Sequence, residues 1–261
     1  MKQRAEIKAL ARESFKEQRG IGILLYFLFM VIFIAAGLIG RVPFIGPIIF
    51  LGYSLIIAMV MNVGMYEGYL KIYRKEQTEI GVLFSKFNNS FGRALGGMLW
   101  MTLFIIIWSL FASIGGGILF GITAGSILTD ILLDPFAVSF EAIEGIIGVL
   151  ILSSLATILL SIPAIIKSIA YSMTPFILAD KPNVKATEAL KLSMKMTKGY
   201  KGNLFVMTLS FIGWFLLGCL TLGILLIVYV LPYYTTTLSG YYEELKEQAL
   251  ASGAITAEEL A

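Results

Sequence analysis

The sequence predicts an all-α membrane protein with about six transmembrane helices in three hairpins, each preceded by a basic amphipathic helix. Its 261 residues are 58% hydrophobic and 14% charged, whereas soluble domains are about 25% charged. The apolar residues gather in runs of about 20, the helix length that crosses a hydrocarbon core of about 30 Å. A soluble globule and a disordered chain are therefore excluded, and the single cysteine, Cys219, excludes a disulfide scaffold.

Six apolar runs are the candidate spans. They cover, in order, residues 21–40, 44–66, 94 to beyond 114, 146 onward, 204–220 and 222–242. The small residues Ala35 and Ala36 would also suit a cleavable signal peptide at the first run. The spanning length of that run, and the second run directly after it, favour a retained transmembrane helix.

The basic residues fall on one side of the predicted membrane. Of the 20 Lys and Arg residues, all but Arg41 lie before the first run, after the second, between the fourth and fifth, or after the sixth. The longest loop on the other side carries Asp130, Asp134, Glu141 and Glu144. Because basic residues near helix ends stay in the cytoplasm, we expect both termini to be cytoplasmic.

Rare residues indicate an internal repeat. Met101-Thr102-Leu103 recurs as Met207-Thr208-Leu209, and the same shift lays Trp108 on Trp214. The second and sixth runs also end alike, in Gly64-Met65-Tyr66-Glu67 and Gly240-Tyr241-Tyr242-Glu243. We therefore predict a single membrane domain of three units. The units cover residues 1–71, 72–183 and 184–246, with an external insertion at about 115–145 and a polar C-terminal tail at 247–261.

A basic segment with an apolar stripe precedes each hairpin. The stripes are Ile7, Leu10, Ala11 and Phe15; Ile80, Leu83, Phe84, Phe87 and Phe91; and Ala186, Leu190, Met194 and Thr197. We expect these segments to lie flat on the cytoplasmic leaflet, with the stripe in the acyl boundary and the basic face among anionic lipid headgroups. The alternative is three solvated loops.

Lys167 is the one charge within the apolar stretch of residues 146–179. A helix of that length exceeds the hydrocarbon core, so we expect a hinge at Pro163. Lys167 then either extends its amine to the cytoplasmic interface or points into the bundle as a binding cation; the interface is favoured because lysines near helix ends commonly reach it.

Polar side chains on other predicted spans are further site candidates. Thr235 and Thr237 follow a second predicted hinge, Pro232, in the sixth run, and Asn62 lies in the second. Such side chains either hold helices together or line a substrate path, and we favour the first. Glycines four residues apart predict close helix contacts. They are Gly64 and Gly68, Gly92 and Gly96, and Gly117, Gly121 and Gly125.

The signatures of an enzyme are absent from the sequence. It contains no His, which removes the commonest general base and metal ligand. It has no nucleotide-binding glycine fingerprint, no phosphate-binding loop and no nucleophile elbow, and its acids do not have calcium-loop spacing. We expect no catalysis, no cofactor, no metal site and no nucleic-acid partner.

Several stretches resemble a known family. They are the opening KQRAEIK at 2–8, IPAIIKSIAYSMTPFILAD at 162–180, SFIGWFLLGCLTLGI at 210–224, LPYY at 231–234 and the closing YYEELK. The chain resembles bacterial integral membrane proteins catalogued as domain of unknown function 975. The resemblance implies the topology and a bacterial cytoplasmic membrane, and it implies no activity.

Two functions come first for such a chain, and a membrane enzyme ranks third because catalysis would have to rest on Lys167 or the scattered carboxylates alone. The favoured one is a non-enzymatic membrane component that packs with or regulates a partner, such as a transport or export system, or forms a homo-oligomer. The alternative is a small transporter with a path near Lys167 and the sixth helix.

Overall fold

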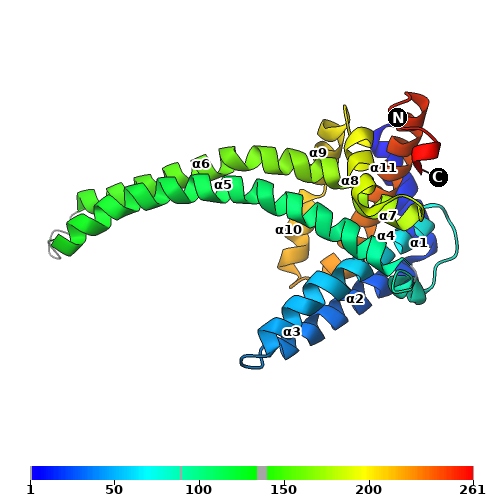
Figure 1. Cartoon of the computed structure of the whole chain (residues 1–261), viewed down its shortest axis with the longest axis horizontal. Helices are drawn as coiled ribbons and strands as arrows, with labels where there is room; N and C mark the ends of the chain where they lie inside the picture. The colour runs from blue at the N-terminus through cyan, green and yellow to red at the C-terminus, as the bar shows by residue number, and fades with distance from the viewer. Residues whose placement is uncertain (1, 89, 134–139, 261) are drawn as a thin grey trace. The chain divides into compact units, whose positions relative to one another are not determined.

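The computed structural model is helical throughout, with no β-strand in the residues that it describes, 2–88, 90–133 and 140–260 (Figure 1). The α-helices are α1 (Arg4–Glu17), α2 (Arg19–Ile39), α3 (Gly46–Gly52), α4 (Ala58–Tyr73), α5 (Phe91–Leu133), α6 (Phe140–Tyr171), α7 (Thr174–Asp180), α8 (Ala186–Met196), α9 (Lys201–Leu209), α10 (Ile212–Leu220) and α11 (Leu231–Ala251). The π-helical turns η1 (Tyr53–Ile57) and η3 (Leu226–Val230) precede α4 and α11, and η2 (Ile80–Phe84) and η4 (Glu258–Leu260) are 3-10 turns.

The chain forms two compact units. Residues 1–101 and 169–261 make up unit 1, and residues 102–168 make up unit 2. Unit 1 contains the first apolar hairpin, α9, α10 and a core built from α1, α4, α7, α8 and α11. Unit 2 consists of the long parts of α5 and α6.

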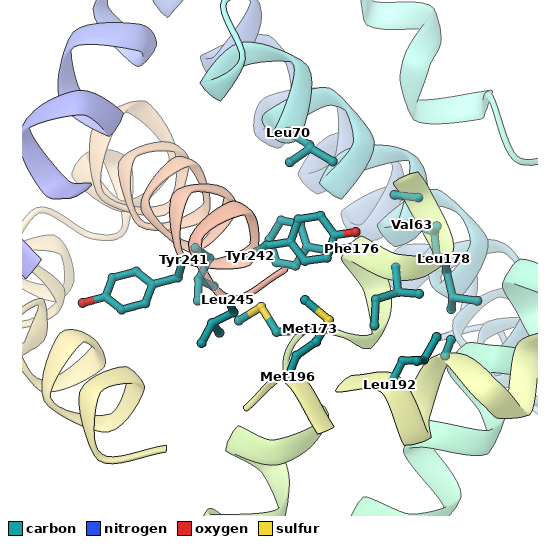
Figure 2. Packing of buried hydrophobic residues seen from close by; sticks show 14 of the residues in the cluster. Val63, Leu70, Met173, Phe176, Leu178, Leu192, Met196, Tyr241, Tyr242 and Leu245 are labelled. Atoms are coloured by element: carbon teal, nitrogen blue, oxygen red, sulfur yellow. The ribbon is translucent and has the colours of Figure 1, made fainter. Parts of the chain in front are cut away.

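Aromatic side chains lie at the centre of the unit 1 core. Phe176 of α7 stacks on Tyr242 of α11 (Figure 2), and their ring centroids lie 5.4 Å apart. Tyr66 of α4 meets the same Phe176 edge-on at 4.6 Å. Phe176 therefore joins three helices that are distant in sequence. Burial of each such large apolar side chain stabilises the fold by about 1.5–3 kcal/mol.

Five helices, not six, are long and apolar enough to cross a membrane among the described residues. They are Arg19–Ile39, Gly46–Tyr73, Phe91–Ile122, Ile147–Asp180 and Lys201–Leu220. The predicted sixth span falls on η3 and the first half of α11, where the hydroxyl residues lower the hydropathy. Thr235, Thr237 and Tyr242 are buried there among other helices, so the arrangement of six helices in three hairpins is not confirmed.

The apolar stripes of the first and third basic segments are covered by protein. Ile7 and Phe15 of α1 are almost completely buried, as is Leu190 of α8. The expectation that lipid covers these two stripes is wrong, because α1 packs on α11 and α4 while α8 packs on α7 and α11. In the second segment only η2 is helical before α5 begins; Leu83 is buried, whereas Ile80 and other stripe residues are exposed.

Unit 2 is an antiparallel pair of helices, and Figure 1 shows α5 and α6 running side by side. Gly115 and Gly116 of α5 lie so close to Leu160 and Thr157 of α6 that a Cβ atom at either glycine would collide. The predicted external insertion is a continuation of both helices over its described residues. Of the predicted external acids, Asp134 lies outside the described residues, and the structure gives no side-chain detail for Asp130 and Glu141.

The two predicted hinge prolines differ in their surroundings. Pro163 lies inside α6, which continues to Tyr171. Pro232 lies in the first turn of α11, directly after η3. The carbonyl four residues before Pro232 is that of Val228 in η3, which is where the proline ring crowds the helix. The hinge role of both prolines stays a prediction.

Candidate functional site

The hydroxyl residues of α11 mostly bond within their own helix. Thr237 donates to the carbonyl of Tyr233 at 2.8 Å, and Ser239 donates to that of Thr235 at 3.0 Å. Thr235 is the exception, because its hydroxyl lies 2.6 Å from the hydroxyl of Tyr26 on α2. Thr235 therefore holds α2 and α11 together, as expected of polar side chains between membrane helices.

The other two predicted site residues lie apart from this contact. Asn62 is half-buried on α4, in unit 1 with the threonines. Lys167 belongs to unit 2, where its amine lies 5.0 Å from the ring centroid of Trp108 on α5. The structure thus brings Thr235 and Thr237 together on one helix and places Lys167 beside an aromatic ring.

Lys167 marks one end of an apolar band. The next charged residue toward the start of α6 is Glu144. That separation corresponds to about 34 Å of helix, close to the hydrocarbon thickness of about 30 Å. Aromatic and basic side chains commonly sit together at a membrane interface, so the geometry favours the interfacial position for Lys167.

A cluster of charges joins α4, α7 and α11. Arg74, just after α4, donates to Asp180 at 2.7 Å and to Glu243 at 2.5 Å. Lys246 pairs with Asp180 at 3.2 Å and with Glu243 at 2.8 Å, and the Tyr242 hydroxyl donates to Asp180 at 2.9 Å. We call these five residues the charge cluster.

The charges of this cluster compensate one another. Burial acts to lower the pKa of Arg74, but its hydrogen bonds and charge contacts with Asp180 and Glu243 outweigh this effect and raise the pKa. Burial, followed by the Asp180 charge, raises the pKa of Tyr242, so its hydroxyl stays a donor. The cluster offers no uncompensated base or nucleophile. Its geometry is that of a clamp between helices.

A second set of ion pairs surrounds the end of α4. Glu67 accepts from Lys71 at 3.0 Å and from Lys86 at 2.9 Å. Lys86 also donates to the carbonyl of Ala179, and Arg93 donates to that of Leu178, so both cations meet the last turn of α7. Cations are favourable there because the carbonyl end of a helix is negative.

These clusters are the part of the site that the sequence reasoning missed. Glu67, Asp180 and Glu243 are each the first acid after an apolar run, at the ends of the second, fourth and sixth runs. That recurrence was a usable signal, but it does not show which cation each carboxylate meets. Arg74 finds its two partners through the packing of α4 against α7 and α11.

A basic groove lies along the outer face of α1. It consists of two open depressions of about 530 and 640 Å³ that share Ala5, and the side chains of Lys8, Arg12, Lys16 and Tyr233 line the larger one. We call this larger depression the α1 groove. Lys8 donates to the hydroxyl of Ser210 at 3.0 Å, and its amine lies 4.2 Å from the ring centroid of Phe211. The groove therefore joins a row of cations to the break between α9 and α10.

The comparisons with known proteins decide the family. The profile of the family described as "Protein of unknown function (DUF975)" matches residues 1–249. The chain belongs to this family. No curated protein and no solved structure matches the chain.

The match of this DUF975 chain confirms the resemblance carried by its opening, its central IPAIIKS stretch and its C-terminal half. The residues after 249 lie beyond the match, and most of those that the structure describes are exposed. Ile255 and Leu260 are buried against the unit 1 core, and Glu259 pairs with Lys195 of α8 at 2.5 Å.

Proposed function

We propose that this protein is a non-enzymatic membrane component that packs against a transmembrane helix of a partner protein. One observation carries the proposal. Gly117, Gly121 and Gly125 recur every fourth residue on α5, and each is exposed with open space where a side chain would stand. A face of small residues lets a second helix approach closely.

The same helix already uses glycine in this way. A Cβ atom at Gly115 or Gly116 would collide with Leu160 or Thr157 of α6 unless these side chains shifted. Gly117, Gly121 and Gly125 make no such contact and lie next to exposed apolar residues such as Ile118 and Ile122. A lipid tail gains little from a flat glycine surface, whereas a helix gains packing contacts along it.

The contacts of the candidate polar residues support packing over transport. A transport path needs polar groups that face a shared cavity. Thr237 bonds to its own helix, Thr235 bonds to Tyr26, and Lys167 rests on Trp108. The small-transporter alternative therefore has no observation in its favour in the described part of the chain.

The proposed setting is the bacterial cytoplasmic membrane, with both termini in the cytoplasm and basic segments near anionic lipid headgroups. The charge distribution in the sequence supports this orientation. The contact of Lys2 with Glu244 at 2.6 Å supports a common side for the two ends, because it joins the start of α1 to the last part of α11.

A photo-crosslinking amino acid at Gly121 tests the partner proposal in cells. We expect a protein adduct of one defined mass, which identifies either a second copy or a different membrane protein. Adding Gly117→Leu should reduce this adduct several-fold, because the leucine fills the open face one turn away.

Two controls make the result specific. The crosslinker at Ile151, which is exposed on α6, should give lipid adducts alone. Ile118→Val, a conservative change beside the glycines, should leave the Gly121 adduct unchanged. Lack of a protein adduct at Gly121, or an adduct that persists undiminished in the Gly117→Leu variant, would contradict the proposal.

A further inference from the structure

The outer face of α1 carries cations without protein partners. Two of the three acids of α1, Glu13 and Glu17, both accept from Lys75, at 2.7 and 2.8 Å. Arg12 and Lys16 are exposed, and neither has an ion-pair partner among the described residues. The one carboxylate that lines the α1 groove, that of Glu13, is thus already engaged by Lys75.

The packing of α1 and the contacts of Lys8 fix the shape of the α1 groove. The apolar stripe of α1 is buried in the core, which fixes the direction of its basic face. The Tyr233 hydroxyl donates to the carbonyl of Lys8 at 3.2 Å, and Lys8 reaches Ser210. The cations therefore project from a packed helix and not from a loose loop.

The α1 groove lies at a boundary between charged and apolar surface. Directly after Phe211, α10 exposes Ile212 and Leu216 by 57% and 62%. Charged side chains cannot face hydrocarbon without a large cost, whereas exposed leucine and isoleucine suit it. The hydrocarbon boundary on this side of unit 1 must therefore pass between α1 and α10.

Aromatic rings mark the same boundary. Tyr233 lies 5.6 Å from Tyr229, and Tyr229 lies 5.3 Å from Trp214, measured between ring centroids. Tyrosine and tryptophan gather at the level of lipid headgroups because one part of each ring is polar and the rest is apolar. The protein surface thus changes from cations to aromatic rings to apolar side chains. This order matches the headgroup, interfacial and acyl-chain regions of a lipid monolayer.

We propose that the α1 groove binds the phosphate of an anionic phospholipid, with Arg12 and Lys16 as its ligands and the acyl chains along α10. A guanidinium can bond two phosphate oxygens at once, and Lys8 adds positive charge at the inner end. The volume of about 640 Å³ suits a headgroup. An acidic protein segment fits less well, because the groove opens onto an apolar surface. The proposal rests on the proposed membrane location and does not depend on the partner helix.

Fluorescence of Trp214 tests this site in the purified full-length chain. In a Trp100→Phe, Trp108→Phe background, Trp214 is the single reporter. The protein is placed in nanodiscs of phosphatidylethanolamine with increasing brominated phosphatidylglycerol, whose bromines quench indole on contact. We expect half-maximal quenching at a several-fold lower mole fraction than with brominated phosphatidylethanolamine.

The Arg12→Gln, Lys16→Gln variant should lose that preference. Each basic residue near an anionic surface contributes about 1 kcal/mol, or about fivefold, so removal of both charges is enough to abolish a several-fold preference. Lys191→Gln with Lys198→Gln removes the same charge from exposed positions outside the groove and should leave the preference intact. Soluble glycerol phosphate should not relieve quenching, because the site requires a lipid.

The outcomes separate this proposal from the proposed function. Equal quenching by the two brominated lipids in the wild type would overturn the lipid site and leave the membrane location standing. Quenching by neither lipid would overturn the membrane location itself. Retention of the preference by a folded Arg12→Gln, Lys16→Gln variant, or relief of quenching by glycerol phosphate, would also overturn the site.

Discussion

Single charged residues in this protein act mainly as fasteners between helices. Glu67, Asp180 and Glu243 each end an apolar run and each accepts from at least two donors. A carboxylate with matched donors is held in place, and removing one partner leaves an uncompensated charge. The role of a polar residue in this protein therefore follows from the groups that it contacts and not from its polarity alone.

The pair of Lys2 and Glu244 gives a pH-dependent prediction. Burial acts to raise the pKa of Glu244, but hydrogen bonds from the Lys2 amine and amide outweigh it and lower the pKa. The pKa of Lys2 is raised, chiefly by its hydrogen bond with Glu244. The pair therefore stabilises the fold fully above the ordinary carboxylate pKa of about 4, and up to about pH 10.

Glu244→Gln should lower the free energy of unfolding by about 1–2 kcal/mol at pH 7. The difference from wild type should shrink as pH falls through the lowered pKa of folded Glu244, because the wild type then loses the same charge. Chemical unfolding in mild detergent measures both values. Glu247→Gln, at an exposed position on the same helix, is the control and should be close to neutral. An equal loss at low and neutral pH would contradict the ion-pair account.

At the scale of elements, glycines allow neighbouring segments to pack directly against the helix backbone. Gly64 on α4 lies against η2, where a Cβ atom would stand 2.6 Å from the carbonyl oxygens of both Val82 and Leu83. Gly240 on α11 lies against the Tyr73 ring and Ile7 of α1. Each glycine is the first residue of the four-residue sequence with which the second and the sixth run end. Both runs therefore use this position for a close contact. The internal repeat itself stays a prediction.

Gly64→Ala should destabilise the protein by about 1–3 kcal/mol, since backbone oxygens cannot move aside as a side-chain tip can. Gly52→Ala is the matched control in the same hairpin, because nothing lies within 4 Å of a Cβ atom there. We expect the control to be neutral or slightly stabilising, since alanine favours helix. Thermal unfolding of the two variants side by side measures the difference, and equal midpoints would show that η2 does not press on α4.

At the scale of the whole molecule, the start of α1 contacts the second half of α11. Lys2 meets Glu244, and the turn between α2 and α3 is separated from that contact by the length of α2. A helix of 21 residues is about 32 Å long, which matches the hydrocarbon core. If the first hairpin crosses the membrane, its turn lies on the opposite side from this contact, and the proposed orientation places the turn outside.

Thiol labelling checks this topology in intact cells. In a Cys219→Ser background, a cysteine at the exposed Val42 should react with a membrane-impermeant maleimide added outside. A cysteine at the exposed Gln77, beyond the end of α4, should react only after permeabilisation. Labelling of both from the same side would mean that the hairpin does not cross, and the reverse pattern would invert the orientation.

The sequence by itself determined the class of the protein, the positions of five apolar helices and the family. Apolar run length and charge content are local properties that add along the chain, so no knowledge of packing is needed to use them. The same holds for the stripe on α1, whose period predicts a helix wherever that helix lies.

Only the tertiary structure decided what covers each surface. An apolar stripe such as Ile7, Ala11 and Phe15 suits a lipid tail and a protein core equally well, because the hydrophobic effect does not depend on direction. The hydroxyls of α11 and the acid Asp180 likewise have several possible partners until the helices are packed. The partner of a side chain depends on contacts between segments far apart in sequence, and in α1 these contacts cover the apolar stripe with protein.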